Sequence, residues 1–259
     1  MNLEKSDLSE LARIADGVLA YDHSKSARMA EKNATPIESW SVPVTEIFAN
    51  TNIRLDATYF DPKAAYVVRS LRNSGLQLSE LSDLARVELR SQFTRIWAQD
   101  RKHGIPYFNA TDLLSLFALG EPGGGLRYLS HATDTNIDSL VVREGWLLMT
   151  CSGTIGRVFY VPRRLDGWVA THDLIRIIAN DPGMTGYLYA WLRTPTAQAQ
   201  ILRHTHGGQI DHVTDNQVAG VLVPHLPPSE IQRIHTLVSA ALLDREKAIE
   251  NLNQAWPKE

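Results

Sequence analysis

The stretch Gly145–Ile178, GWLLMTCSGTIGRVFYVPRRLDGWVATHDLIRII, constrains the fold of this chain more than any other segment. Short apolar runs alternate with glycine turns at Gly153, Gly156 and Gly167. This pattern predicts a strand, a tight turn, a strand, a polar turn and a third strand. The turns hold a set of donors and cations, namely Ser152, Thr154, Arg157, Arg163 and Arg164. A rigid β scaffold with such groups at its tips is suited to contacts with phosphates or base edges.

Composition limits the class of protein. The chain has 259 residues, enough for two modest domains or one large one, and 44% of them are hydrophobic. The net charge of −3 excludes a uniformly basic nucleic-acid binder, so any such contact must come from local basic patches. The single cysteine, Cys151, excludes an intrachain disulfide and fits a reducing compartment. With no secretory h-region and no run of about 18 apolar residues, we expect a cytoplasmic protein without a membrane segment.

The N-terminal 49 residues are expected to form a helix and a linker arm. Apolar residues over 6–20 have helical spacing, and residues 21–39 are polar and mixed in charge. The helix either packs on its own domain or docks a partner.

Residues 50–225 are expected to form the main domain. Asp61 and Pro62 predict the cap and first residue of a helix that ends near Asn73. Short strands and loops follow to residue 110, and then a short helix capped by Thr111. Two helical pieces over 185–203 are separated at Pro195, with Thr194 as cap, and Thr214 caps a short turn.

A basic segment lies at residues 86–103. It has five basic residues against two acidic ones, and Phe93 and Trp97 lie between the cations. Such a run is either a solvated face or a nucleic-acid contact, and the interleaved aromatics favour nucleic acid. The cations in this segment that we assign to phosphate contacts are Arg90, Arg95, Arg101 and Lys102.

A long helix is predicted over about residues 230–256. Ser229 and Gln232 form a capping-box pattern at its start. Apolar residues then recur every seven positions for more than three repeats, with one charged interruption at Arg245. This pattern favours pairing with another helix over packing on its own domain. The predicted pairing residues are Ile231, Ile234, Val238, Ala241, Leu242, Arg245, Ala248, Ile249 and Leu252.

Two other hypotheses give the chain a catalytic or a metal-binding site. Cys151 and Arg157 have the C-x5-R spacing of a cysteine phosphatase, but a strand is predicted after them rather than the helix that would lower the thiol pKa. The histidines between 204 and 212 lack a repeated ligand motif, so a DNA-contacting loop containing Gln209 is favoured over a metal site. The sequence therefore predicts a protein without catalysis or cofactor.

Several segments, in this order, resemble the specificity (S) subunit of type I restriction–modification systems. They are RLDATYFDP (54–62), GIPYFNATDL (104–113), EGWLLMTCSGTIGRVFYVP (144–162), WVATHDLIRI (168–177) and GGQIDHVTDNQVAGVLVPHLPPSEIQRI (207–234). A typical member has two recognition domains and two helical spacers, whereas this chain has one of each. It therefore resembles a half-length specificity subunit.

The resemblance implies an α+β fold: a β-rich target recognition domain with peripheral helices, then a long coiled-coil helix over residues 226–259. It implies a non-catalytic role in phage defence, in which the chain selects a bipartite sequence in double-stranded DNA. The implied partners are a DNA adenine methyltransferase (modification) subunit and a translocase–nuclease (restriction) subunit. The chain is expected to form a homodimer or to pair with another half subunit. A cysteine phosphatase and an assembly module that does not bind DNA remain the alternatives.

Overall fold

Two four-stranded sheets form the centre of the fold. The computed structural model describes residues 39–48, 54–206 and 211–255. Within these residues the central sheet has the strand order β2-β9-β6-β7, and the distal sheet has the order β3-β5-β4-β8. The central strands are β2 (Ala85–Glu88), β6 (Leu147–Thr150), β7 (Val158–Tyr160) and β9 (Leu174–Ala179). The distal strands are β3 (Trp97–Ala98), β4 (Gly104–Phe108), β5 (Arg127–Ser130) and β8 (Val169–Ala170). A third, two-stranded sheet joins β1 (Leu78–Glu80) to β10 (Leu222–Pro224).

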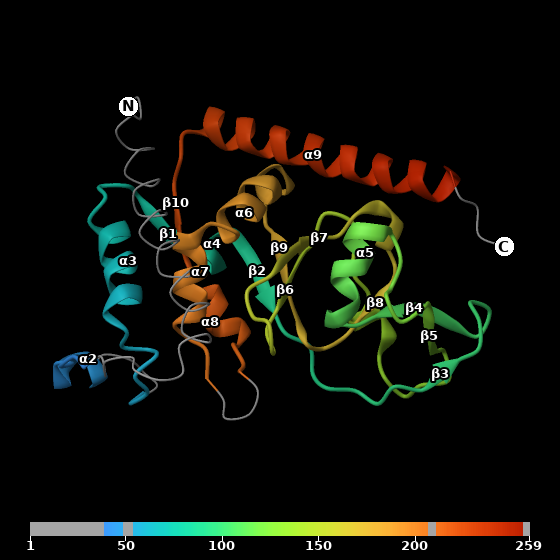
Figure 1. The fold of residues 1–259 in the computed structure, drawn as a ribbon, viewed down its shortest axis with the longest axis horizontal. Coiled ribbons are helices and arrows are strands. Elements are labelled where there is room, and N and C mark those ends of the chain that lie inside the picture. Colours follow the sequence, from blue (N-terminus) through green and yellow to red (C-terminus); the bar gives the residue numbers. More distant parts are fainter. Residues whose placement is uncertain (1–38, 49–53, 207–210, 256–259) are drawn as a thin grey trace, which may run out of the picture.

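Helices cover these sheets, and the longest of them is α9 (Figure 1). They are α2 (Val44–Phe48), α3 (Pro62–Arg72), α4 (Leu81–Leu84), α5 (Leu113–Leu119), α6 (Thr185–Leu192), α7 (Pro195–Leu202), α8 (Asp215–Ala219) and α9 (Pro228–Ala255). Figure 1 shows α9 along the upper side of the molecule, above α6 and α5. The predicted α+β fold with a long C-terminal helix is confirmed.

Strand β6 separates two hydrophobic cores. Leu147 and Met149 lie in a core shared with α6, α7 and α9, whereas Leu148 points into a core shared with α5 and β8. Successive side chains of a strand point to opposite faces, so one four-residue strand supplies both cores. The predicted hairpin is confirmed as β6 and β7, which pair antiparallel. The single third strand predicted for this segment is instead two strands: β8 pairs with β4 in the distal sheet, and β9 pairs with β6 on its other edge.

Three of the predicted helix caps are present in the structure. Asp61 accepts from the Lys63 amide at 2.8 Å, Thr194 from the Ala197 amide at 3.2 Å and Thr214 from the Gln217 amide at 3.3 Å. These three contacts confirm the predicted starts of α3, α7 and α8.

Two predicted caps are wrong. Asn109 rather than Thr111 caps the turn before α5, because its side chain accepts from the Asp112 amide at 3.2 Å. Helix α9 begins at Pro228, so Ser229 lies in its first turn and Gln232 donates to Thr236 instead. The helix predicted over residues 6–20 lies outside the described residues.

Helix α9 packs on its own domain through one of its faces. Leu242 and Ile249 are buried, and Ile231, Ile234 and Val238 pack against the same core as α6. The guanidinium of Arg245 lies 4.8 Å from the ring centroid of Phe117. These six residues of α9 contact their own chain, which corrects the prediction that they pair with another helix.

Two glycines allow this close approach. A Cβ on Gly186 of α6 would lie 2.9 Å from the backbone of His235. A Cβ on Gly120, just after α5, would lie 2.6 Å from Ile249, and Gly120 also has a φ of 83°. A side chain at either position would clash with α9. These two glycines therefore allow α9 to lie against α6 and the end of α5.

A buried arginine connects the two large sheets. Arg176 of β9 has a fully buried side chain. Its guanidinium donates to the carbonyls of Leu174 at 2.9 Å, Leu140 at 3.1 Å and Ala170 at 3.2 Å, and more weakly to Thr171. Ala170 belongs to β8, so a side chain of the central sheet holds a strand of the distal sheet. Burial lowers the pKa of Arg176 to about 10, which leaves the side chain charged at neutral pH.

We expect Arg176→Met to lower the free energy of unfolding by about 3–5 kcal/mol, because the substitution leaves buried carbonyls without a donor. Urea denaturation followed by circular dichroism measures the change. Arg163→Met is the matched control, because Arg163 is exposed and its loss should change stability by less than about 0.5 kcal/mol. Equal stability of the two variants would contradict a connecting role for Arg176.

Candidate nucleic-acid interface

Several loops lie together on the side of the molecule opposite α9, and we call this surface the loop face. It comprises residues 54–60, 89–96, 151–154 and 171–173, and the segments that flank 207–210. In Figure 1 these segments lie along the lower edge, whereas α9 lies along the upper edge. Both large sheets contribute loops to it, so the loop face is a single surface formed from distant parts of the sequence.

The β6–β7 turn is joined to the loop before α8. The Ser152 hydroxyl lies 3.0 Å from Nδ1 of His212, and the Gly153 amide donates to the Asp211 carbonyl at 3.2 Å. Ser152 therefore lies on the loop face, and Thr154 is exposed in the same turn. Arg157 follows this turn and is also exposed. Gln209, the other residue assigned to base edges, lies outside the described residues.

The segment before α3 is anchored to the end of α7. Arg54 donates to the carbonyls of His204 at 2.9 Å and Thr205 at 3.0 Å. The ring of Tyr59 lies 4.7 Å from the Arg54 guanidinium and 4.6 Å from that of Arg203. Burial, with the nearby arginines, lowers the pKa of His204 to about 4, so this histidine is neutral at pH 7. It is therefore a packing residue and not a cation for phosphate.

Arg90 of the basic segment is already paired with a carboxylate. Its guanidinium lies 2.5 Å from Glu88, and the neighbouring Leu89 amide donates to Asp215 at 2.9 Å. The carboxylate of Glu88 therefore neutralises part of the charge of Arg90, the residue predicted to contact phosphate.

Arg95 is held at a fixed position beside the distal sheet. Its Nε donates to the Tyr107 hydroxyl at 2.9 Å, and Nη2 donates to the Thr171 hydroxyl at 3.2 Å. Neither contact is with a carboxylate, so Arg95 keeps its full charge for an anionic ligand.

Arg127 is a functional candidate that the sequence analysis missed. It pairs with Asp112 at 2.8 Å and lies 5.4 Å from the ring centroid of Tyr107. Arg127 reaches Tyr107 because β5 pairs with β4, and this pairing has no signal in the local sequence. Together with Arg95 it lines a pocket of about 270 Å³.

Arg101 and Lys102 are exposed in the turn between β3 and β4. The turn is ordered by Asp100, which accepts from the Lys102 amide at 2.9 Å and from His103 at 2.8 Å. The hydrogen bond from His103 holds the pKa of the Asp100 carboxyl below its usual value. Both cations therefore project from a structured turn, as a backbone phosphate contact requires.

Arg163 and Arg164 lie away from the loop face, which corrects their assignment to phosphate. Arg164 donates to Glu246 of α9 at 2.7 Å, to the Leu116 carbonyl at 2.6 Å and to the Gly120 carbonyl at 3.3 Å. Arg163 lies in the same one-turn helix, Arg163–Leu165. Arg164 therefore fixes α9 to the end of α5.

The geometry does not favour a cysteine phosphatase. The side chain of Cys151 is 3% exposed, and burial raises the pKa of its thiol. The chain continues from Arg157 into strand β7, so no helix N-terminus faces the sulfur. Among the described residues no group of three or more His, Cys, Asp or Glu side chains could hold a metal ion.

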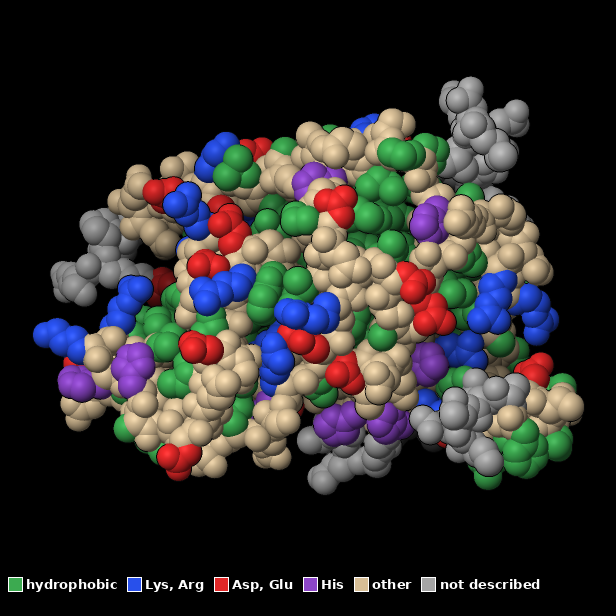
Figure 2. Space-filling model, turned by 180° about the vertical axis from the view of Figure 1, so that it is seen from behind, with side chains coloured by type: hydrophobic (Ala, Val, Ile, Leu, Met, Phe, Trp, Pro, Cys, Tyr) green, Lys and Arg blue, Asp and Glu red, His purple; other side chains and the backbone are tan. Residues whose placement is uncertain are grey.

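Charge on the surface is mixed. Figure 2 shows Lys and Arg side chains interspersed with Asp and Glu, and histidines at the lower edge. A surface of this kind favours recognition by individual contacts over binding by a uniform field. Over the described ranges, the helices are too short or too polar to cross a membrane.

Comparisons with known proteins identify the family. The sequence model of the type I restriction modification DNA specificity domain matches residues 73–251. No curated protein matches the chain.

Solved structures of low sequence identity also match. The HsdS subunit from Thermoanaerobacter tengcongensis matches at 13% identity and a TM-score of 0.43, over 98% of this chain and 53% of that one. The S subunit of a type I restriction–modification system from M. genitalium matches at 12% and 0.39, over 64% and 39%. A chain from a structure on complex assembly and conformational transition of the type I R-M system matches at 15% and 0.46, over 70% and 44%. The chain thus spans about half or less of the length of these structures.

The family match covers both large sheets, the loop face from residue 89 onward and most of α9. The chain belongs to the family of type I restriction modification DNA specificity domains.

Proposed function

We propose that this chain selects the DNA sequence on which a type I restriction–modification system acts. The observation that supports the proposal best is the family match over residues 73–251, which includes most of the loop face. The chain would act without catalysis of its own. Its partners would be a DNA adenine methyltransferase subunit and a translocase–nuclease subunit, in the cytoplasm.

The loop face and the turn between β3 and β4 supply two kinds of DNA contact in this proposal. Arg95, Arg101 and Lys102 contact phosphates, because their charges are not neutralised by a carboxylate. Arg90 contributes less, since Glu88 pairs with it. Ser152, Thr154, Arg157 and Gln209 are proposed to contact base edges, because the first three lie at or beside an exposed hairpin turn.

A second copy would pair along the exposed flank of α9. Residues with helical spacing form a second apolar stripe there, separate from the face that packs on the domain. This exposed stripe consists of Leu237, Ala241, Ala248, Leu252 and Ala255. Small side chains let two helices approach closely, and antiparallel pairing would give a twofold dimer. A dimer or a pair of half subunits would then contact two half-sites.

Selection from random-sequence duplexes tests the proposed function. We expect the chain to enrich an inverted repeat whose half-sites lie about one DNA turn apart, because α9 is about 40 Å long. The enriched duplex should bind at least about 1,000-fold more tightly than a scrambled one. Binding of both duplexes with equal affinity would refute sequence selection and favour an assembly role.

Lys102→Ala is expected to weaken binding to all duplexes alike and to reduce the slope of log K against log salt by about one, because one phosphate contact is lost. Fluorescence anisotropy at several salt concentrations measures the slope. Lys247→Ala is the matched control, since Lys247 is exposed on α9, on the opposite side of the molecule from the loop face. A slope that changes equally in both variants would remove Lys102 from the interface.

Leu252→Asp is expected to convert a dimer of about twice 28.9 kDa into a monomer, because it places a charge in the exposed stripe. Light scattering of the purified chain measures the mass. Leu243→Asp serves as the control, because Leu243 is equally exposed but lies on the other flank of α9. A wild-type monomer would show that the stripe does not pair two copies.

A further inference from the structure

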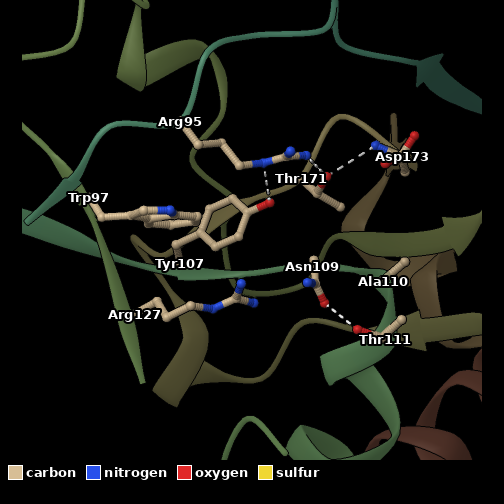
Figure 3. Close-up of a pocket in the computed structure, with 9 residues that line it drawn as sticks. All are labelled: Arg95, Trp97, Tyr107, Asn109, Ala110, Thr111, Arg127, Thr171 and Asp173. Carbon is tan, nitrogen blue, oxygen red and sulfur yellow. Dashed lines mark hydrogen bonds between the residues drawn. The ribbon is translucent and has the colours of Figure 1, made fainter. Parts of the chain in front are cut away.

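A pocket beside the distal sheet is not explained by the contacts described above. It has a volume of about 270 Å³ and opens between β3, β4 and the turn after β8 (Figure 3). Trp97, Tyr107 and two arginines line it on one side, and Asn109, Thr111, Thr171 and Asp173 complete the lining (Figure 3). Pockets of this size hold one small group rather than a large cofactor.

The aromatic wall is rigid. Tyr107 is almost fully buried, and its ring lies between Arg95 and Arg127, at 5.8 and 5.4 Å from their guanidinium carbons (Figure 3). Trp97 meets Tyr107 edge-on with ring centroids 5.1 Å apart, and 46% of Trp97 remains exposed. An exposed indole fixed in this way can stack on a planar group without a large loss of side-chain entropy.

The opposite wall can form hydrogen bonds. The oxygen of the Asn109 side chain accepts from Thr111 at 2.6 Å and from the Asp112 amide, so its NH₂ group is left to donate. Asp173 also lines the pocket, beside Thr171, and its carboxylate lies 3.3 Å from Nε2 of His172. The Asn109 NH₂ group can therefore donate to an acceptor on the edge of a nucleobase.

The shape of the pocket decides which part of DNA it can receive. Base edges of an intact duplex lie inside the grooves, so a protein contacts them with protruding groups and not with a hollow. A phosphate could contact the two arginines, but it has no planar surface to stack on Trp97. A base turned out of the helix fits both walls, and the two arginines offset the charge of its adjacent phosphates.

We propose that this pocket holds one base of the DNA in an extrahelical position, with the base stacked on Trp97 and its edge accepting a hydrogen bond from Asn109. The inference rests on the proposed function, because it needs DNA at the loop face. It adds a recognition mode in which one nucleotide leaves the stack inside the specificity domain itself.

Three duplexes that differ only at their centre test the inference. One is fully paired, one has a single unpaired adenine, and one has an abasic residue in place of that adenine. The unpaired adenine costs little to extrude, so we expect it to bind about tenfold more tightly than either other duplex. Anisotropy titration at low salt with the full chain gives the three affinities.

Variants of the chain assign the preference to the pocket. Trp97→Ala should reduce the preference for unpaired adenine to about twofold or less, and Trp97→Phe should restore most of it. Ile96→Ala is the matched control, because Ile96 has similar exposure at the adjacent position but does not line the pocket. The measured quantity is the ratio of the affinity for the unpaired-adenine duplex to the affinity for the paired duplex. A general loss of DNA binding lowers both affinities and leaves this ratio unchanged.

The outcomes separate this inference from the proposed function. If the wild type binds the paired duplex but shows no preference for unpaired adenine, the pocket does not hold a base, and the proposed function stands. The same conclusion follows if the abasic duplex binds as well as the adenine duplex, or if the preference survives Trp97→Ala. If no duplex binds at all, the proposed function fails together with the inference.

Discussion

A single buried guanidinium sets the relation between the two large sheets. Arg176 lies in the central sheet, yet its acceptors include a strand of the distal sheet and the carbonyl of Leu140. Removing a charge from water costs several kcal/mol, and hydrogen bonds to four carbonyls offset that cost. The loop face receives segments from both sheets, so its geometry depends on this side chain although Arg176 itself is buried.

The position of α9 follows from contacts that the main domain provides. Gly186 and Gly120 let the helix approach α6 and α5, and Arg164 pairs with Glu246 across the same interface. The helix therefore extends from the domain in a fixed direction. If two copies pair along the exposed stripe, the separation and orientation of their loop faces are fixed by packing within each chain.

The sequence predicts local features of this fold better than long-range ones. The caps Asp61, Thr194 and Thr214 act on neighbouring amides, so short patterns were sufficient to find them. The heptad pattern predicted helix α9 correctly. It assigned residues of both apolar stripes to helix pairing, because residue spacing alone does not show which stripe packs on the domain.

In the candidate site, too, local sequence signals were more informative than contacts between distant residues. Ser152 and Thr154 were predicted because a glycine turn is a local signal, and Lys102 because basic residues cluster around it, and their contacts with DNA stay predictions. Arg164 was misassigned because its partner Glu246 lies 82 positions away. Arg127 and Tyr107 were missed because only the pairing of β4 with β5 brings them together.

Strand β6 supplies side chains to both cores, so neither core can form fully without the other. Most buried apolar side chains lie in strands and helices, whereas most side chains proposed to contact DNA lie in turns and loops. Natural variation can then replace the turn residues without a penalty in folding. A scaffold of this kind permits related chains to diverge in the DNA sequence they select while the fold stays constant.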